Sequence, residues 1–211
     1  MKLSKGLWAV AVILLLLVID QAIKIYVKTN MALYEDIHIA DWFLIRFVEN
    51  PGMAMGIEIG GKLFLSIFRI IASFAIIYYL WTLIKKGFRL GYILCVSLIF
   101  AGAVGNIIDS VFYGVIFSES TPFTVATLFP ADGGYGTLMH GKVVDMFYFP
   151  LFEFTWPDWI PFIGGSQFEF FRYIFNFADA CISVGMVTLL LFYWKDFTKS
   201  FEKKEIQEIE N

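Results

Sequence analysis

Four long apolar segments dominate the pattern of hydrophobic and polar positions along the chain. Each is close to the roughly 20 helical residues that span a bilayer core of about 30 Å. None alternates as a barrel strand does, so each is expected to satisfy its backbone hydrogen bonds as a helix. The predicted transmembrane helices cover about residues 7–27, 63–84, 90–109 and 172–194.

The segments between these spans indicate a smaller amount of sheet. Asp41 to Val48 is rich in aromatic and β-branched residues, which favours a short strand, and Asn50-Pro51-Gly52 favours a turn. The expected fold class is an all-α membrane protein, residues 1–211 forming a single integral membrane domain. It has four transmembrane helices, a small extracytoplasmic β-containing domain and long outer loops.

Charge predicts how the chain sits in the membrane. Lysine and arginine concentrate in short stretches near the N-terminus, at residues 85–89 and at 195–204, and are sparser in the two long loops. The positive-inside rule therefore predicts cytoplasmic termini, outer loops at 28–62 and 110–171, and a cytoplasmic tail at 195–211. The chain is 59% hydrophobic with a net charge of -3, which gives no sign of nucleic-acid binding.

Polar residues inside the spans gather at one depth. With a rise of about 1.5 Å per residue, Asp20 and Asp179 both lie about 10 Å from the outer ends of their helices, and Arg69 lies at a similar depth. Asn106 and Asp109 close the outer end of the third span. The polar groups thus form a layer in the outer third of the membrane.

Helical spacing pairs several of these groups. Asp20 and Lys24 are four residues apart and can form an ion pair, and Asn176 and Asp179 share a face. Gly102 and Gly105 share the face of Asn106 and Asp109, and they allow close approach of another helix.

The same polar residues also have a purely structural interpretation. Such groups can simply hold helices together, and this is the favoured interpretation for Asp20 with Lys24 and for Asn106 with Asp109. Asp179 has no cation near it in its own span, which favours a functional role.

Five short motifs occur in order along the chain: DQAIK at 20–24, NPGMAMG at 50–56, GAVGNIID at 102–109, GKVVDMF at 141–147 and FNFADACI at 175–182. In these motifs the chain resembles the lipoprotein signal peptidases, the type II signal peptidases of bacteria. The resemblance covers all four spans.

The resemblance implies an aspartic endopeptidase that removes signal peptides from diacylglyceryl-modified prolipoproteins, cutting before the lipidated cysteine. It also implies a multi-pass protein of the bacterial inner membrane with its active site near the outer leaflet. Asp145 and Asp179 would be catalytic. The residues expected to bind substrate or support the site are Asp20, Lys24, Asn50, Gly52, Asn106, Asp109, Asn176 and Arg69. Prolipoproteins and membrane lipid are the expected partners, and no metal, organic cofactor or nucleic acid is expected.

Two departures from the family pattern stand out. Ser110 occupies a position where the family has arginine, and an insertion at 111–140 separates the third and fourth motifs. We consider that Arg69 replaces the missing arginine by holding a carboxylate such as Asp109, or alternatively extends to the membrane interface. The insertion is either a lid over the site or a surface elaboration without a kinetic role.

Two carboxylates and a water can hydrolyse a peptide bond, one taking a proton from the water while the other, protonated, polarises the carbonyl. Close aspartates share one proton, and the sequence does not assign it.

The segment around Asp145 is apolar, which suggests a segment re-entering the membrane edge. The alternative functions are a proton- or ion-coupled transporter and a non-catalytic scaffold. The inner two-thirds of the spans are nearly free of charge, which disfavours the transporter.

Overall fold

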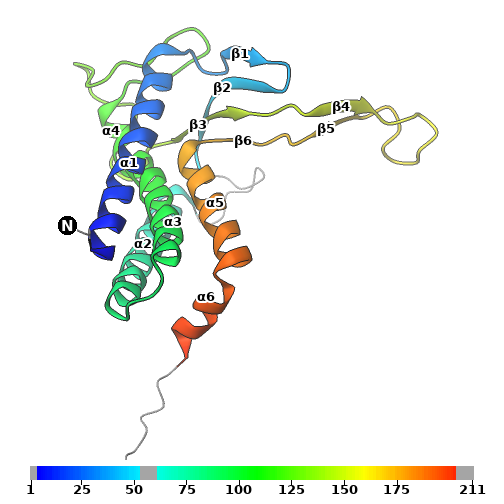
Figure 1. Ribbon diagram of the computed structural model, residues 1–211. Coiled ribbons are helices and arrows are strands. Elements are labelled where there is room, and N and C mark those ends of the chain that lie inside the picture. Colours follow the sequence, from blue (N-terminus) through cyan, green and yellow to red (C-terminus); the bar gives the residue numbers. More distant parts are fainter. Residues whose placement is uncertain (1–3, 53–60, 203–211) are drawn as a thin grey trace, which may run out of the picture.

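The computed structural model describes residues 4–52 and 61–202. Four long helices stand side by side, and a small sheet lies at one end of this bundle (Figure 1). The long helices are α1 (Lys5–Asn30), α2 (Gly61–Lys85), α3 (Leu90–Ile108) and α5 (Phe177–Phe192). Shorter helical elements are η1 (Asp109–Tyr113, a π-helix), α4 (Gly114–Ile116) and α6 (Trp194–Phe201). The strands are β1 (Asp36–Ala40), β2 (Phe43–Asn50), β3 (Val143–Tyr148), β4 (Phe152–Thr155), β5 (Gln167–Phe170) and β6 (Ile174–Phe175).

Three helical segments among the described residues are long and apolar enough to cross a membrane, namely Lys5–Asn30, Leu63–Lys85 and Leu90–Ile116. The pair α5 and α6 passes the same test only together, and it is bent by 86°. The chain is therefore mostly helical with some antiparallel sheet. The all-α part of the predicted fold class is not confirmed, and a count of four spans requires that α5 and α6 be taken as one.

The helix ends differ from the sequence prediction for local reasons. The first helix continues to Asn30, which places Lys28 inside the helix and not in an outer loop. The third continues beyond Asp109 as η1 and α4, because π-type and α-type turns follow without a break. The fourth begins at Phe177, because Asn176 caps it and residues 174–175 belong to a strand.

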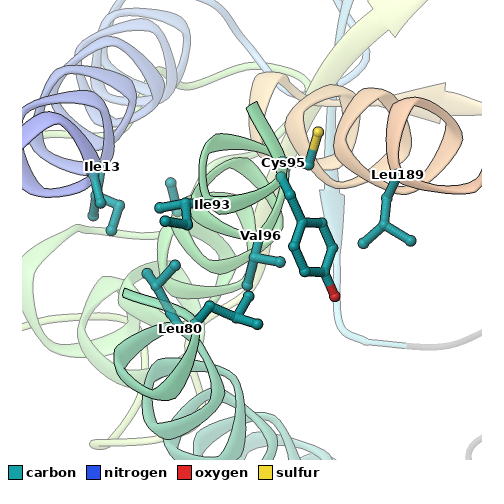
Figure 2. Close-up of a cluster of buried hydrophobic side chains, with 10 residues drawn as sticks. Ile13, Leu80, Ile93, Cys95, Val96 and Leu189 are labelled. Atoms are coloured by element: carbon teal, nitrogen blue, oxygen red, sulfur yellow. The ribbon is translucent and has the colours of Figure 1, made fainter. Parts of the chain in front are cut away.

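The bundle packs around α3. Its glycines allow close contact with α5: a Cβ on Gly102 would lie 2.3 Å from the carbonyl oxygen of Ala178, and one on Gly185 would lie 2.9 Å from that of Cys95. The predicted close approach at Gly102 is thus confirmed. Figure 2 shows the apolar side chains that meet between the helices, among them Ile13, Leu80, Ile93, Cys95, Val96 and Leu189.

The larger sheet is antiparallel, with strand order β1-β2-β3-β6. The strand expected at Asp41–Val48 is present as β2, two residues further along. The segment around Asp145, expected to re-enter the membrane edge, is instead β3. Its apolar residues Val144 and Met146 are buried in a cluster with residues of α1, β2 and η1. Because strand residues alternate, Asp145 points to the other side of β3, toward α5.

Candidate active site

Asp145 and Asp179 come from different elements and meet at one asparagine. The Asn176 side-chain amide donates to Asp145 Oδ1 at 2.6 Å. The backbone of Asn176 donates to Asp179 Oδ2 at 3.3 Å, and Asn176 Oδ1 accepts from the backbone of Asp179 at 2.9 Å. This reciprocal pair is a capping box at the start of α5. The cap that begins the helix therefore also brings the two carboxylates to one place.

Two further asparagines complete the ring around the carboxylates. Asn106 Nδ2 donates to Asp179 Oδ1 at 2.8 Å, and Asn50 Nδ2 donates to Asp145 Oδ2 at 3.2 Å. Asn50 Oδ1 accepts from the backbone of Gly52 at 2.8 Å, which closes the predicted turn. Gly52 has a φ of +91°, a conformation that favours glycine. The structure thus brings together Asn50, Asn106 and Asn176 with both aspartates; Met53 to Gly56 of the second motif lie outside the described residues.

A buried lysine lies beneath this ring. Lys24 Nζ is 3.0 Å from Asp20 Oδ2, 2.8 Å from Asp109 Oδ2 and 2.9 Å from Asn106 Oδ1. The predicted pairing of Asp20 with Lys24 is confirmed. Each carboxylate also holds an element of the candidate site. Asp20 Oδ1 accepts from the backbone of Ala178 in α5 at 3.0 Å, and Asp109 Oδ2 accepts from the backbone of Val144 in β3 at 3.3 Å. Removing the cation would leave two buried carboxylates unpaired.

The environment of Asp145 favours its protonated form. Burial, and after it the neighbouring Asp179 carboxylate, raise the pKa of Asp145 from 3.8 to about 7. Hydrogen bonds from Asn176 and Asn50 oppose this rise in pKa, because they stabilise the charged form. Asp145 can therefore keep a proton near neutral pH, as a general acid requires.

Arg69 reaches the site by a different contact from the one predicted. Its guanidinium donates to Ser110 Oγ at 3.1 Å, and Ser110 Oγ lies 2.9 Å from the carbonyl oxygen of Asn106, to which it donates. The expected fork of Arg69 on Asp109 is not formed. Asp109 is instead bonded to Lys24 and to Gln21, whose Nε2 donates to it at 3.0 Å. A lysine already occupies the position that a second cation would need.

A second buried charged cluster was missed from the sequence. Lys28 is fully buried, forms a salt bridge with Glu49 and donates to Ser120 Oγ at 2.9 Å. Its ammonium also lies 5.3 Å from the ring centre of Phe117 and 5.0 Å from that of Tyr135. The insertion at 111–140 supplies three of these four partners. The available signal was the spacing of charges along α1, since residue 28 lies one turn beyond Lys24 on the same face.

The insertion is packed into the body of the molecule at its ends. Phe117 is buried, and a Cβ on Gly134 would lie 2.2 Å from the carbonyl oxygen of Gly114. Gly134 therefore allows close packing of two backbone segments of the insertion. A Cβ on Gly133 would meet nothing within 4 Å, and its φ of +89° lies in the left-handed region that favours glycine. In the parts of the chain that the structure describes, no three His, Cys, Asp or Glu side chains are grouped so that they could hold a metal ion.

The fold and site define a helical membrane protein in which a buried and a partly buried carboxylate meet where a helix bundle joins a small sheet. Known proteins agree with this description. A sequence model described as signal peptidase (SPase) II matches residues 12–195. The chain therefore belongs to the signal peptidase II family and, with its several apolar helices, is a multi-pass membrane protein. The resemblance seen in the five motifs is confirmed.

Individual relatives support the same conclusion. A lipoprotein signal peptidase of Porphyromonas gingivalis is 57% identical over 193 residues, covering 91% of this chain and 85% of that protein. One from Amoebophilus asiaticus is 34% identical over 215 residues, covering 98% of this chain and 86% of the relative. A solved structure of a bacterial membrane enzyme has the same fold, with a TM-score of 0.60, 24% identity and 93% coverage of each chain. These relatives give no support to the transporter alternative.

Proposed function

We propose that this protein is an aspartic endopeptidase that removes signal peptides from diacylglyceryl-modified prolipoproteins, cutting before the lipidated cysteine. The observation that carries the proposal is the sharing of Asn176 by Asp145 and Asp179. Membership of the signal peptidase II family and the name of the Porphyromonas relative supply the substrate class.

In the proposed reaction Asp145 carries the shared proton and Asp179 is the base. Asp145 would donate a hydrogen bond to the scissile carbonyl while Asp179 takes a proton from water. The water oxygen bonds to the carbonyl carbon, and the C–N bond then breaks as the leaving nitrogen receives a proton. The raised pKa of Asp145 supports this assignment. The donors on Asp179, from Asn106 and from the backbone of Asn176, suit a charged carboxylate.

The site contains three asparagines that would keep these roles apart. Asn176 and Asn50 hold the two oxygens of Asp145, while Asn106 holds one oxygen of Asp179. In this proposal Asn106 is in turn positioned by Lys24, whose ammonium lies 2.9 Å from its Oδ1. Preorganised polar groups of this kind need little rearrangement when charge develops during the reaction.

We further propose that α5 and α6 count as one span, which gives four transmembrane segments in the bacterial inner membrane. Both termini would be cytoplasmic, and the dyad would lie near the outer leaflet. Cysteines introduced at Ser4 and Thr198 should then react with membrane-impermeant reagents only from the cytoplasmic side, and one at Thr121 only from outside. Labelling of position 198 from outside would contradict the arrangement.

The central test is cleavage of a lipidated precursor by asparagine variants. Asp145→Asn and Asp179→Asn should each lower the rate by about 100-fold or more, because an amide cannot exchange the proton. Asp132→Asn is the matched control, since this carboxylate is exposed in the insertion. Normal processing by either dyad variant would reject the assignment.

Arg69 completes the proposal as the substitute for the arginine that the family pattern has at position 110. Arg69 would act through Ser110, to which its guanidinium donates. Ser110 donates to the carbonyl oxygen of Asn106, and the Asn106 side chain donates to Asp179. The chain of contacts therefore leads from α2 through α3 to one of the two carboxylates.

A further inference from the structure

The β4–β5 ribbon leaves the body of the molecule. It is a separate two-stranded antiparallel sheet between β3 and β6. Figure 1 shows it running sideways from the sheet end of the bundle, across the direction of the helices. In a protein whose helices cross a bilayer, an element with this direction extends along the membrane surface.

The pairing of the two strands gives the ribbon one aromatic side. Phe152 lies opposite Phe170 with ring centres 4.6 Å apart, and Phe154 lies opposite Phe168 with ring centres 5.0 Å apart. Because successive strand residues point to opposite faces, these four phenylalanines share a side. The other side is polar, and its pairs are Glu153 with Glu169 and Thr155 with Gln167.

The aromatic side is incompletely covered by the rest of the protein. Phe152 is 51% exposed, Phe154 39% and Phe170 42%. The turn beyond them carries Trp159 at 80% and Phe162 at 107% exposure. A two-stranded ribbon is marginal by itself in water, and an apolar face needs a second layer to cover it.

Contacts at the base of the ribbon indicate which way the aromatic side faces. Glu169, on the polar side, accepts a hydrogen bond from the Tyr148 hydroxyl. Tyr148 points to the side of β3 opposite Asp145, because the two are three positions apart in the strand. On the Asp145 side, Phe171 contacts Phe175 with ring centres 6.1 Å apart. Since Glu169 and Tyr148 meet on the polar side, the aromatic side of the ribbon faces the other way, which on β3 is the side of Asp145 and α5.

The helix bundle from which the ribbon extends also carries exposed apolar side chains. Val184 and Val187 of α5 are 55% and 54% exposed, and Phe74 of α2 is 68% exposed. Phenylalanine, tryptophan and tyrosine are favoured where hydrocarbon meets headgroups. Lipid is therefore the covering layer that suits an aromatic ribbon extending from a bundle of membrane-spanning helices.

We propose that the ribbon, residues 149–173, is a membrane-interface element whose aromatic side lies in the leaflet nearest the sheet. Its covering partner is the lipid of the surrounding bilayer. The ribbon connects β3, which carries Asp145, to β6, which precedes the Asn176 cap. Its attachment to lipid would hold both strands at a fixed height above the membrane.

The test compares environment-sensitive labels on neighbouring positions of the ribbon. The full chain, with Cys95→Ala and Cys181→Ala, is reconstituted in phosphatidylcholine–phosphatidylglycerol vesicles that contain lipid spin-labelled near the headgroup. The spin-labelled lipid should quench a nitrobenzoxadiazole label on Phe154→Cys at least about twice as strongly as one on Thr155→Cys. Position 155 is the next residue along the strand and lies on the polar side. A label on Phe162→Cys should also be quenched, and this substitution removes no packed side chain because Phe162 is fully exposed.

Several outcomes would overturn the proposal. Labels at positions 154 and 162 that are both unquenched would show that lipid does not cover the ribbon. Equal quenching at positions 154 and 155 would reject the two-sided arrangement. Quenching at position 154 that appears only when the protein is diluted in lipid would point to a second copy as the covering partner. Shielding of position 154 only after addition of a lipidated peptide would point to substrate in place of the bilayer.

Discussion

Replacement of Asp145 by asparagine should stabilise the folded protein at alkaline pH while it abolishes activity. Asp145 is 4% exposed, and burial raises its pKa from 3.8 to about 7. In the unfolded chain the carboxyl loses its proton above its ordinary pKa, whereas the folded protein retains the proton until the pH passes its higher pKa. The folded state is therefore progressively disfavoured as pH rises between about 4 and 7.

The size of this effect follows from the change in pKa. A rise of about 3 pKa units, at about 1.4 kcal/mol for each unit, lowers the free energy of unfolding by about 4 kcal/mol above pH 7. At pH 5 only about 1.5 kcal/mol of this cost has developed. Asparagine removes the titration. Asp145 accepts hydrogen bonds from both Asn50 and Asn176, whereas the single side-chain oxygen of asparagine faces only one of these two donors. The expected net gain at pH 8 is therefore about 2 kcal/mol.

Two native cysteines provide the assay. Cys95 and Cys181 are each 6% exposed, so a thiol-reactive dye reports unfolding of the bundle during heating. Asp145→Asn should unfold at a higher temperature than the unsubstituted protein at pH 8, by about 2–4 °C for each kcal/mol. At pH 5 the lost hydrogen bond slightly outweighs the roughly 1.5 kcal/mol gained, so the difference should vanish or reverse.

The control and the refuting result both concern the pH dependence. Asp132→Asn, on the exposed insertion, should shift neither curve. A difference between Asp145→Asn and the unsubstituted protein that is the same at pH 5 and pH 8 would refute the reasoning, because it would show that removal of a titrating charge is not the cause. A lower unfolding temperature at pH 8 would have the same consequence.

Three other changes test separate parts of the structure. Arg69→Lys should lower the cleavage rate about tenfold, since a lysine cannot reproduce the guanidinium contact. Adding Ser110→Arg to Arg69→Ala should restore cleavage. Normal cleavage by Arg69→Lys would exclude Arg69 as the substitute for the family's arginine. Gly102→Leu should destabilise the bundle by about 3 kcal/mol or more in the thiol assay, because its side chain meets the backbone of Ala178; an unchanged unfolding temperature would contradict the close packing of α3 on α5. Lys28→Met should cost about 1–3 kcal/mol and expose the insertion to limited proteolysis, since the buried Glu49 then keeps only Lys142 as a cation. A protease-resistant insertion would argue against this anchor.

Much of the site could be predicted from local sequence. Motif order identified the family, and the spacing of Asp20 and Lys24 on one helix predicted their ion pair, because residues four apart in a helix are neighbours. The same rule would have found Lys28, had the first helix been extended by one turn. It was not, because the apolar run ends before the helix does.

The contacts between distant segments were decided by the tertiary structure. Asn176 meets Asp145 only because β3 pairs with β6 and the helix cap follows directly. Arg69 bonds to Ser110 and not to Asp109, because Lys24 from another helix already neutralises that carboxylate.

The sequence by itself determined the apolar helices, the likeness to a family and the residue types available for chemistry, since hydrophobic length and short-range spacing are properties of one segment. The tertiary structure alone decided which carboxylate is buried enough to keep a proton, and which side of the β4–β5 ribbon is aromatic. Burial depends on what other segments supply, and the side on which a ribbon residue lies depends on strand register.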